Sequence, residues 1–167
     1  TGVENISLNR CSINASDRMT AICLILTNGG AHNNWVKYKE RGEKMPVALI
    51  VGAPPMLQVI GPQKTPEHLH DLDVAGGLAG VPFRKVACKT VPLMAPADAQ
   101  IIIEGWIDPT KLEMEAPFGE SYGNMSVEEY NHSVEVTAIT RRKKAIITSM
   151  ISQMAPSESG VIKQLNY

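Results

Sequence analysis

Short runs of apolar and β-branched residues recur along the chain, separated by polar stretches rich in Gly, Pro and charged residues. Runs of this length and composition are typical of buried or half-buried strands. Two of them stand in the first half, at residues 19–27 and 46–52, and four more make the second half strand-rich: residues 83–89, 100–107, 134–140 and 145–152. Asp108-Pro109-Thr110 is expected to end the strand at 100–107, and the basic residues 141–144 are expected to form a solvated hairpin between the last two strands.

Helical periodicity is clearest at residues 32–41, where Trp35 and Tyr38 share one face and charged side chains largely occupy the other. Gly42 is placed to end this helix, because glycine readily adopts the left-handed conformation that follows a last helical turn. Shorter helices are predicted at residues 56–60, at residues 71–78, and from a capping Ser157 to Gln164. Together with the strands, these helices favour an α+β fold that resembles a β-barrel.

Composition narrows the class of protein. A chain of 167 residues with 44% hydrophobic residues suits one globular domain, residues 1–167, that can bury a sizeable core. The formal net charge of −1 argues against a nucleic-acid partner, and no apolar run or signal peptide indicates a membrane partner. Cys11, Cys23 and Cys88 lack the spacing of metal ligands, which favours free thiols in the reducing cytoplasm.

Candidate chemistry is concentrated in residues 115–120 (EAPFGE), where a Pro and a Gly between two glutamates forbid a continuing helix. A bend of this kind can turn Glu115 and Glu120 toward one pocket, with Phe118 as an apolar wall. Two carboxylates in one pocket do not ionise together easily, so one of them becomes a plausible proton donor near neutral pH. From the residues alone, the alternative is a pair of solvated turn residues, which is the commoner case for an arbitrary glutamate pair.

The same stretch resembles the E-x-P-[FY]-G-[ED] signature of the UbiD family of reversible decarboxylases. Four other segments resemble family segments in the same order: residues 5–10 (NISLNR), 71–78 (DLDVAGGL), 95–105 (APADAQIIIEG) and 136–142 (VTAITRR). The resemblance covers essentially the whole chain but only the central part of a family member. It therefore implies a fragment or a subunit of a longer UbiD-like enzyme, which is expected to be slow or inactive in isolation.

The resemblance implies a split β-barrel that binds prenylated FMN, whose phosphate is held by a divalent metal, Mn²⁺ or Mg²⁺, and commonly by K⁺. Asn5 and Asp71 would be metal ligands, with Asp71 in place of the usual Glu. The family's metal-binding His falls near Gly29-Gly30, where this chain has none, so His32 is the nearest candidate and Asn28 a weaker one. The cofactor-binding residues implied are Asn5, Ser7, Leu8, Asn9, Arg10, Asn28, Gly29, His32 and Asp71. Taken without the resemblance, His32 is more simply an exposed helix histidine.

The resemblance also assigns catalytic roles. Arg10 would pair with Glu115 and offer its guanidinium to the substrate carboxylate, as a planar fork of donors can. Glu120 would be the proton donor that replaces CO₂ on the substrate carbon. Without the resemblance, a surface salt bridge is the simpler interpretation of Arg10.

Three functions compete at this point. The first is decarboxylation of an aromatic or α,β-unsaturated carboxylic acid in the cytoplasm, with a flavin prenyltransferase as the source of the cofactor and a homo-oligomer or a complex with the missing regions as the assembly. The second is a split-barrel oxidoreductase that uses ordinary FMN and has no need of Glu115 and Glu120. The third is a non-catalytic cofactor-binding or assembly subunit that needs a partner chain.

Overall fold

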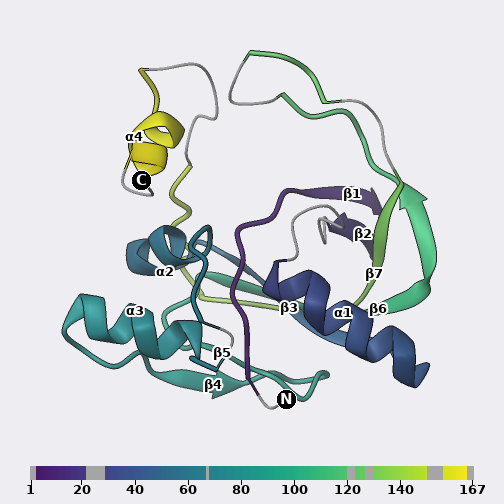
Figure 1. Cartoon of the computed structure of the whole chain (residues 1–167), viewed down its shortest axis with the longest axis horizontal. Helices are drawn as coiled ribbons and strands as arrows, with labels where there is room; N and C mark the ends of the chain where they lie inside the picture. Colours follow the sequence, from purple (N-terminus) through teal and green to yellow (C-terminus); the bar gives the residue numbers. More distant parts are fainter. Residues whose placement is uncertain are drawn as a thin grey trace.

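A five-stranded antiparallel sheet with the strand order β1-β2-β7-β6-β3 is the centre of the computed structural model (Figure 1). The structure describes residues 3–21, 29–66, 68–119, 123–126, 130–149 and 156–164. The sheet strands are β1 Cys11–Ala15, β2 Arg18–Ala21, β3 Met45–Val51, β6 Ile101–Met114 and β7 Tyr130–Arg141. Strands β1 and β3 are its edges, so the sheet does not close into a barrel within the described ranges.

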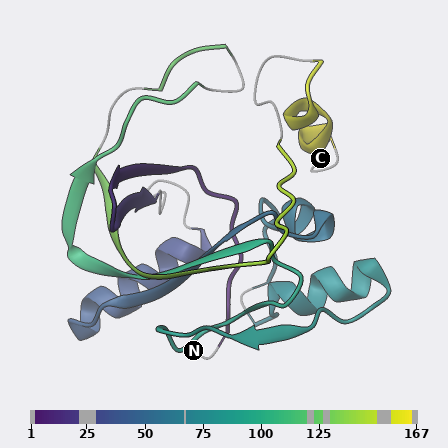
Figure 2. The ribbon, with the colours of Figure 1, turned by 180° about the vertical axis from the view of Figure 1, so that it is seen from behind.

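The two long strands, β6 and β7, carry the curvature of the sheet, and Figure 2 shows their bent path around β1 and β2 from behind. Their pairing shifts register between Glu104 and Gly105 and again between Ile107 and Leu112. At the first shift the backbones come so close that a Cβ on Gly105 would lie 2.5 Å from the carbonyl oxygen of Glu135. Gly105 is therefore required by the close approach of β6 and β7.

The second register shift corrects one expectation, since Asp108-Pro109-Thr110 does not end the strand. Strand β6 continues through Pro109 to Met114. A proline has no N–H to donate to a ladder, but the ladder to β7 is interrupted here, so that donor is not needed. Instead, the backbone N–H and the hydroxyl of Thr110 donate to Asp108 Oδ1, at 3.0 Å and 2.7 Å.

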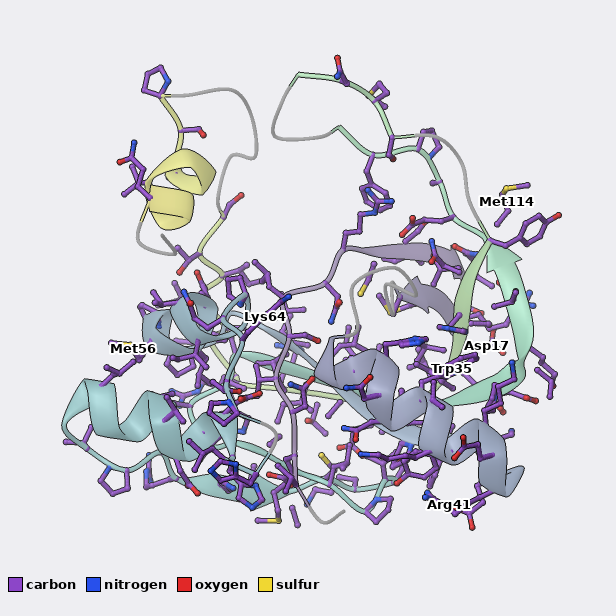
Figure 3. All side chains as sticks on the ribbon, in the orientation of Figure 1. Asp17, Trp35, Arg41, Met56, Lys64 and Met114 are labelled. Atoms are coloured by element: carbon purple, nitrogen blue, oxygen red, sulfur yellow. The ribbon has the colours of Figure 1, made fainter. Side chains whose placement is uncertain are left out.

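Helix α1, Gly30–Arg41, covers one face of the sheet and ends at Gly42, whose φ of 67° is in the left-handed region. Figure 3 places Trp35 between this helix and the strands and Arg41 at the C-terminal end of the helix. Trp35 forms the main buried cluster with residues of four strands: Ala21, Met45, Ile107 and Val134. Burial of this aromatic side chain fixes α1 on the sheet.

A second, smaller core lies beside the sheet. Helices α2 Pro55–Ile60 and α3 Asp71–Ala79 pack on each other through Leu57, Ile60, Leu72 and Ala75. Ile6 and Phe83 pack against this cluster. A two-stranded hairpin, β4 Lys85–Ala87 and β5 Met94–Pro96, follows, and helix α4 spans Glu158–Gln164 with Ser157 Oγ accepting a bond from Gly160 N. Among the described helices, none is long and apolar enough to span a membrane.

Most predicted elements are confirmed, with differences at their ends. Residues 145–149 carry no strand, and the rest of the strand predicted at 145–152 lies outside the described residues. Residues 145–149 therefore do not form the expected hairpin with β7: Ile146 and Ile147 are exposed, and the backbone N–H of Ile146 donates to the side chain of Gln100 instead. Of the strand predicted at 19–27, residues up to Ala21 belong to β2 and residues 22–28 lie outside the described part. The sequence pattern missed β1 and β5.

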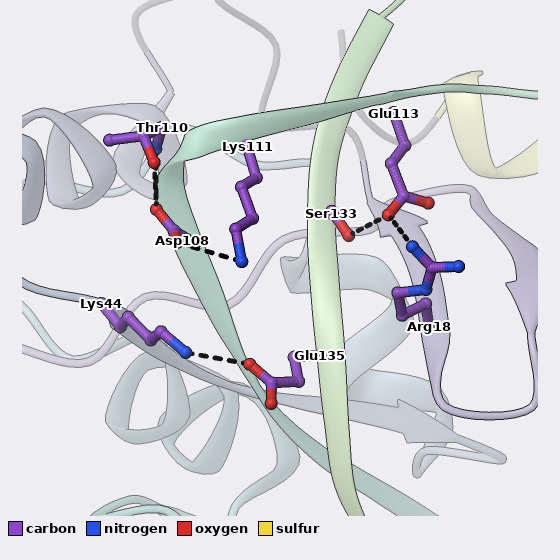
Figure 4. A network of polar contacts seen from close by, with 8 residues as sticks. All are labelled: Arg18, Lys44, Asp108, Thr110, Lys111, Glu113, Ser133 and Glu135. Atoms are coloured by element: carbon purple, nitrogen blue, oxygen red, sulfur yellow. Dashed lines mark hydrogen bonds and ion pairs between the residues drawn. The ribbon is translucent and has the colours of Figure 1, made fainter.

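Charged side chains cover the outer face of the long strands (Figure 4). Glu113 Oε1 accepts bonds from Arg18 Nη1 at 3.0 Å and Ser133 Oγ at 2.9 Å, while Lys44 pairs with Glu135 at 2.9 Å. Exposed ion pairs of this kind contribute little to stability. They identify the solvent-facing side of β6 and β7, opposite to α1.

Candidate active site

A buried ion pair joins two segments that are far apart in the sequence. Arg10 Nη2 lies 2.9 Å from Glu115 Oε2, and the Glu115 side chain is 1% exposed. Arg10 immediately precedes β1 and Glu115 immediately follows β6. The pairing of these two residues, implied by the family resemblance, is confirmed by this contact. A bond from a guanidinium to a carboxylate is charge-assisted and roughly twice as strong as a neutral one.

Sheet register explains why the two residues meet. Cys11 pairs with Ala21, Ala21 with His132, and His132 with Leu112, so these residues form one row across four strands. Moving to the next row in the same direction takes the chain from Cys11 to Arg10 on one side and from Leu112 towards Glu115 on the other. The antiparallel pairing therefore brings the two chain segments to the same end of the sheet.

A third residue, Asn131 of β7, completes this arrangement. Its side-chain Nδ2 donates to the same carboxylate oxygen, Glu115 Oε2, at 2.9 Å. The second oxygen, Glu115 Oε1, is buried and has no hydrogen-bond partner in the described part of the chain. Sequence reasoning missed Asn131, because only the β6–β7 register, in which Glu113 pairs with Asn131, brings it beside this carboxylate.

The loop after Glu115 contains Phe118, whose ring centroid lies 5.4 Å from the Arg10 guanidinium carbon. Phe118 thus packs on the cation, as the expected apolar wall of the site would. Ser126 N donates to Phe118 O at 2.7 Å, and Phe118 N donates to Ser126 Oγ at 2.9 Å, which fixes the base of the loop. Glu120 lies outside the described residues, so its role as proton donor stays a prediction.

The second group of candidates surrounds Asp71, the first residue of α3, which is 3% exposed. Asp71 Oδ2 accepts bonds from Asn5 Nδ2 at 3.0 Å and from the backbone N–H of Ile6 at 2.6 Å. The hydroxyl of Thr65 donates to Asp71 Oδ1. The structure therefore brings Asn5 and Asp71 together, which places two oxygen-bearing side chains of the kind that Mg²⁺ or Mn²⁺ binds side by side.

Helix α1 begins next to this pair, since a Cβ on Gly30 would lie 2.5 Å from Asn5 Nδ2. Gly29 is the residue before the first turn of α1, and its neighbour Asn28 lies outside the described residues. The start of a helix presents N–H groups that suit an anion such as a phosphate. Asn5, Asp71 and this helix start thus lie together, and their binding of a cation and a phosphate stays a prediction.

His32 stands in the first turn of α1, where its half-buried ring belongs to an aromatic group. Its ring stacks on Trp35 with 5.6 Å between centroids, and Trp35 contacts His132 at 4.5 Å. Burial, together with the nearby charges of His32 and Lys39, lowers the pKa of His132 to about 4. Within the described ranges, no group of three or more His, Cys, Asp or Glu side chains is placed to hold a metal ion. The described residues therefore fit a complete metal site only in part.

A cavity of about 720 Å³ opens beside the N-terminal segment. Four candidate cofactor residues line it, Asn5, Ser7, Leu8 and Asn9, together with residues of β3 and β5. This volume lies in the range of sites that bind drug-sized ligands and cofactors. The described residues thus fit a flavin-sized ligand, although Arg10, His32 and Asp71 do not line the cavity themselves.

Comparisons with known proteins agree with this geometry. Residues 1–155 match the model of the UbiD family described as the 3-octaprenyl-4-hydroxybenzoate carboxy-lyase Rift-related domain. An uncharacterized protein of Aquifex aeolicus is 32% identical over 95% of this chain, and one of Synechocystis is 28% identical over 97%. The chain spans about a third of the length of each of these relatives, 32% in both cases.

Solved structures of the UbiD-class enzyme HmfF from Pelotomaculum thermopropionicum are also similar. The structure in complex with FMN has a TM-score of 0.86 and 28% identity over 97% of this chain and 35% of that chain. An evolved dimeric form in complex with prenylated FMN has a TM-score of 0.82 and 31% identity over 88% of this chain and 34% of that chain. Because the family model matches residues 1–155, nearly the whole chain, this chain belongs to the UbiD family.

Proposed function

We propose that this chain is the cofactor-binding part of an enzyme that reversibly decarboxylates an aromatic or α,β-unsaturated carboxylic acid with prenylated FMN. The observation that carries the proposal is the buried pair of Arg10 and Glu115 at the base of the loop that contains Glu120. HmfF structures that hold FMN and prenylated FMN, at 28% and 31% identity, support the choice of cofactor. An oxidoreductase with ordinary FMN would have no use for this buried charge pair.

In the proposed reaction, Arg10 binds and orients the substrate carboxylate while Glu115 holds Arg10 in place. Glu120 then donates a proton to the carbon that has lost CO₂. Prenylated FMN, when bound, supplies the electron sink for the carbanion equivalent, and the protein supplies position and electrostatics. Phe118 excludes water from one side of the guanidinium, which strengthens its attraction for a carboxylate.

The phosphate of the cofactor would lie near Asn5 and Asp71, at the start of α1. A divalent cation, Mn²⁺ or Mg²⁺, would be held by these two oxygen-bearing side chains, with His32 or Asn28 as the third ligand and K⁺ nearby. The contact between the Asn5 and Asp71 side chains supports the first two ligands, and the ring of His32 stacks on Trp35. No step of the proposed reaction depends on the metal.

The proposal extends to the whole protein. The curved antiparallel sheet would be part of a split β-barrel that other residues complete, and the protein would work as a homo-oligomer or in complex with the regions that its longer relatives carry. Cys88, a free thiol, suits a reducing cytoplasm. A flavin prenyltransferase would supply the cofactor.

Two glutamate variants test the proposal in the complete protein loaded with prenylated FMN. Glu120→Gln keeps the shape and hydrogen-bonding capacity but has no transferable proton, so turnover should fall by roughly 10² to 10⁴ while flavin binding persists. Glu115→Gln should weaken the hold on Arg10 and so disturb substrate orientation as well. The measurement is exchange of solvent deuterium into the product, and unchanged exchange in Glu120→Gln would refute the assigned donor.

A further inference from the structure

We infer that Asn131 is a positioning residue that fixes the Glu115 carboxylate and leaves Glu115 Oε1 as the oxygen that contacts the bound ligand. This inference rests on the proposed function, because it treats the surroundings of Glu115 as the site of a bound cofactor and substrate. It goes beyond that function by assigning a role to a residue outside the five segments that resemble the family.

Two donors from different parts of the fold converge on one oxygen. Arg10 comes from the N-terminal segment and Asn131 from the rigid strand β7, and both bonds to Glu115 Oε2 are 2.9 Å long. A carboxylate held at one oxygen from two directions cannot rotate freely about its last bond. Asn131 also adds no charge, so Arg10 keeps its role as the cationic partner in the pair.

The position of the other carboxylate oxygen, Glu115 Oε1, is then fixed as well. Glu115 Oε1 is buried, and within the described ranges it has no hydrogen-bond partner. A buried carboxylate oxygen without a donor is costly, so such atoms usually meet a donor from water or a ligand. We assign to this oxygen an N–H or O–H donor, which either the flavin or the acid substrate can provide.

Strand geometry supports this function for Asn131. Side chains alternate between the two faces of a strand, so Asn131 and Ser133 lie on one face of β7 and the buried His132 on the other. Ser133 bonds to Glu113 on that face, and Glu113 stands two residues before Glu115. Asn131 therefore reaches Glu115 from a backbone that the sheet already fixes, which gives an accurately placed donor.

The test is a double-mutant cycle between Asn131→Leu and Glu115→Gln in the complete protein. Two affinities are measured for each variant by titration: that of FMN, and that of 4-hydroxybenzoate, which has a phenolic O–H to donate, for the FMN-loaded protein. Loss of a bond to a charged group predicts that Asn131→Leu weakens one of the two affinities by roughly 10- to 100-fold. The same substitution should have less than about a twofold effect when Glu115→Gln is already present. The affinity that changes identifies whether the flavin or the acid donates to Oε1.

A matched control separates this role from general loss of an asparagine bond. Asn14 Nδ2 donates to Glu113 Oε2 at 3.0 Å on the exposed outer face, so Asn14→Leu removes a bond of the same type at a glutamate two residues away. Asn14→Leu should leave both affinities within about twofold of the parent. If Asn131→Leu does not fold, Asn131→Ala also removes the donor, with a smaller side chain, and is measured in its place.

Two results would overturn the inference. In the first, Asn131→Leu, or Asn131→Ala in its place, changes neither affinity. In the second, the substitution changes an affinity by the same factor with and without Glu115→Gln. Both are read without a turnover assay, so they are independent of whether the protein decarboxylates any acid. Conversely, full coupling in a protein that shows no decarboxylation would support the positioning role and refute the proposed function.

Discussion

Burial by itself shifts the pKa values of two side chains, Glu104 and His132, in opposite directions. Glu104 is 1% exposed, and its carboxylate accepts bonds from the backbone N–H groups of Lys89 and Thr90 and from the Thr90 hydroxyl. Burial is the largest single influence and raises the pKa of Glu104, but these donors together outweigh it and the pKa is lowered. His132 is as deeply buried, and neither of its ring nitrogens has a partner in the described structure.

Glu104→Gln should destabilise the domain, because an amide offers a single acceptor oxygen and presents N–H donors to the other donors of the turn. One or two buried N–H groups lose their acceptor, which predicts a fall of roughly 1 to 3 kcal/mol in the free energy of unfolding. The measurement is denaturant unfolding at neutral pH. Glu113→Gln, at a more exposed glutamate of the same strand, is the control and should cost less than about 1 kcal/mol. Equal effects of the two substitutions would contradict the role of Glu104.

The low pKa of His132 predicts that the domain loses stability at acid pH. Its folded-state pKa of about 4 lies below its ordinary value of 6.5, so the unfolded chain binds a proton more readily between these values. The contribution of neutral His132 is therefore complete above pH 6.5 and is lost as the pH falls toward 4. The full loss is up to roughly 3 kcal/mol from this one group.

Unfolding free energies measured between pH 4 and pH 7 check this, with His132→Phe as the comparison. The variant keeps an aromatic ring beside Trp35 but cannot titrate, so its stability should depend less on pH in this window. Curves of equal slope for the two proteins would show that another group is responsible. His32 and Lys39 are the neighbouring charges that contribute to the effect, and both are unchanged in the comparison.

At the scale of elements, the contact between β6 and β7 sets the shape of the sheet, and Gly105 is where the two backbones come closest. An added Cβ would lie 2.5 Å from Glu135 O and 2.9 Å from Val134 Cγ1. Backbone cannot give way as a flexible side chain can. The sheet therefore depends on the absence of a side chain at this one position.

Gly105→Ala should lower the free energy of unfolding by roughly 1 to 3 kcal/mol or more, as overpacking in a fixed core does. Gly77→Ala is the matched control, because a Cβ there meets no atom within 4 Å and the residue lies inside helix α3. It should be neutral or stabilise by up to about 1 kcal/mol. Thermal unfolding of both variants decides the matter, and a tolerated alanine at 105 would mean that the strands can separate slightly at the shift.

Local patterns predicted the elements whose signal is local. Helix α1 follows from its apolar face and Gly42, and β3 from a continuous apolar run. Strand β1 was missed because an edge strand with a largely exposed, partly polar sequence has no such signal. Residues 145–149 were wrongly predicted as a strand, because β-branched composition does not reveal whether a partner edge remains open.

Prediction of the candidate site from the sequence is limited in the same way. The pairing of Arg10 with Glu115 was inferred from family resemblance, since the two residues are 105 positions apart in the sequence. The contacts of Asn131 and Glu104 depend on the pairing of β6 with β7 and on the turn after β4, which no short stretch of sequence encodes. Glu120 and Asn28, which lie outside the described residues, remain predictions from the resemblance alone.

At the scale of the whole molecule, residues 3–10 connect the two groups of candidate residues without forming a helix or a strand. One end is held at Asp71 through Asn5 and Ile6, and the other at Glu115 through Arg10. Ile6 also packs into the second core with α2 and α3. The segment thus joins the main sheet to the smaller helical layer.

Asp71→Ala should therefore affect both function and structure. It removes the acceptor of Asn5 and Ile6 as well as the proposed metal ligand, so the complete protein should lose most of its bound flavin and divalent metal. Asp73→Ala is the control, since Asp73 stands in the same first turn of α3 but is exposed. Flavin absorbance and metal analysis of the purified variants give the result, and full occupancy in Asp71→Ala would rule out the assigned ligand.

The length of this segment limits the distance between the two ends of the proposed site. Between Asn5 and Arg10 the backbone can span no more than roughly 18 Å, at about 3.6 Å for each residue. The anion beside Asn5 and the group that meets the Arg10 guanidinium must therefore lie within that span plus the reach of the two side chains, however the rest of the longer protein is arranged around them. The length of this segment thus limits the size of the ligand, independently of the shape of the pocket.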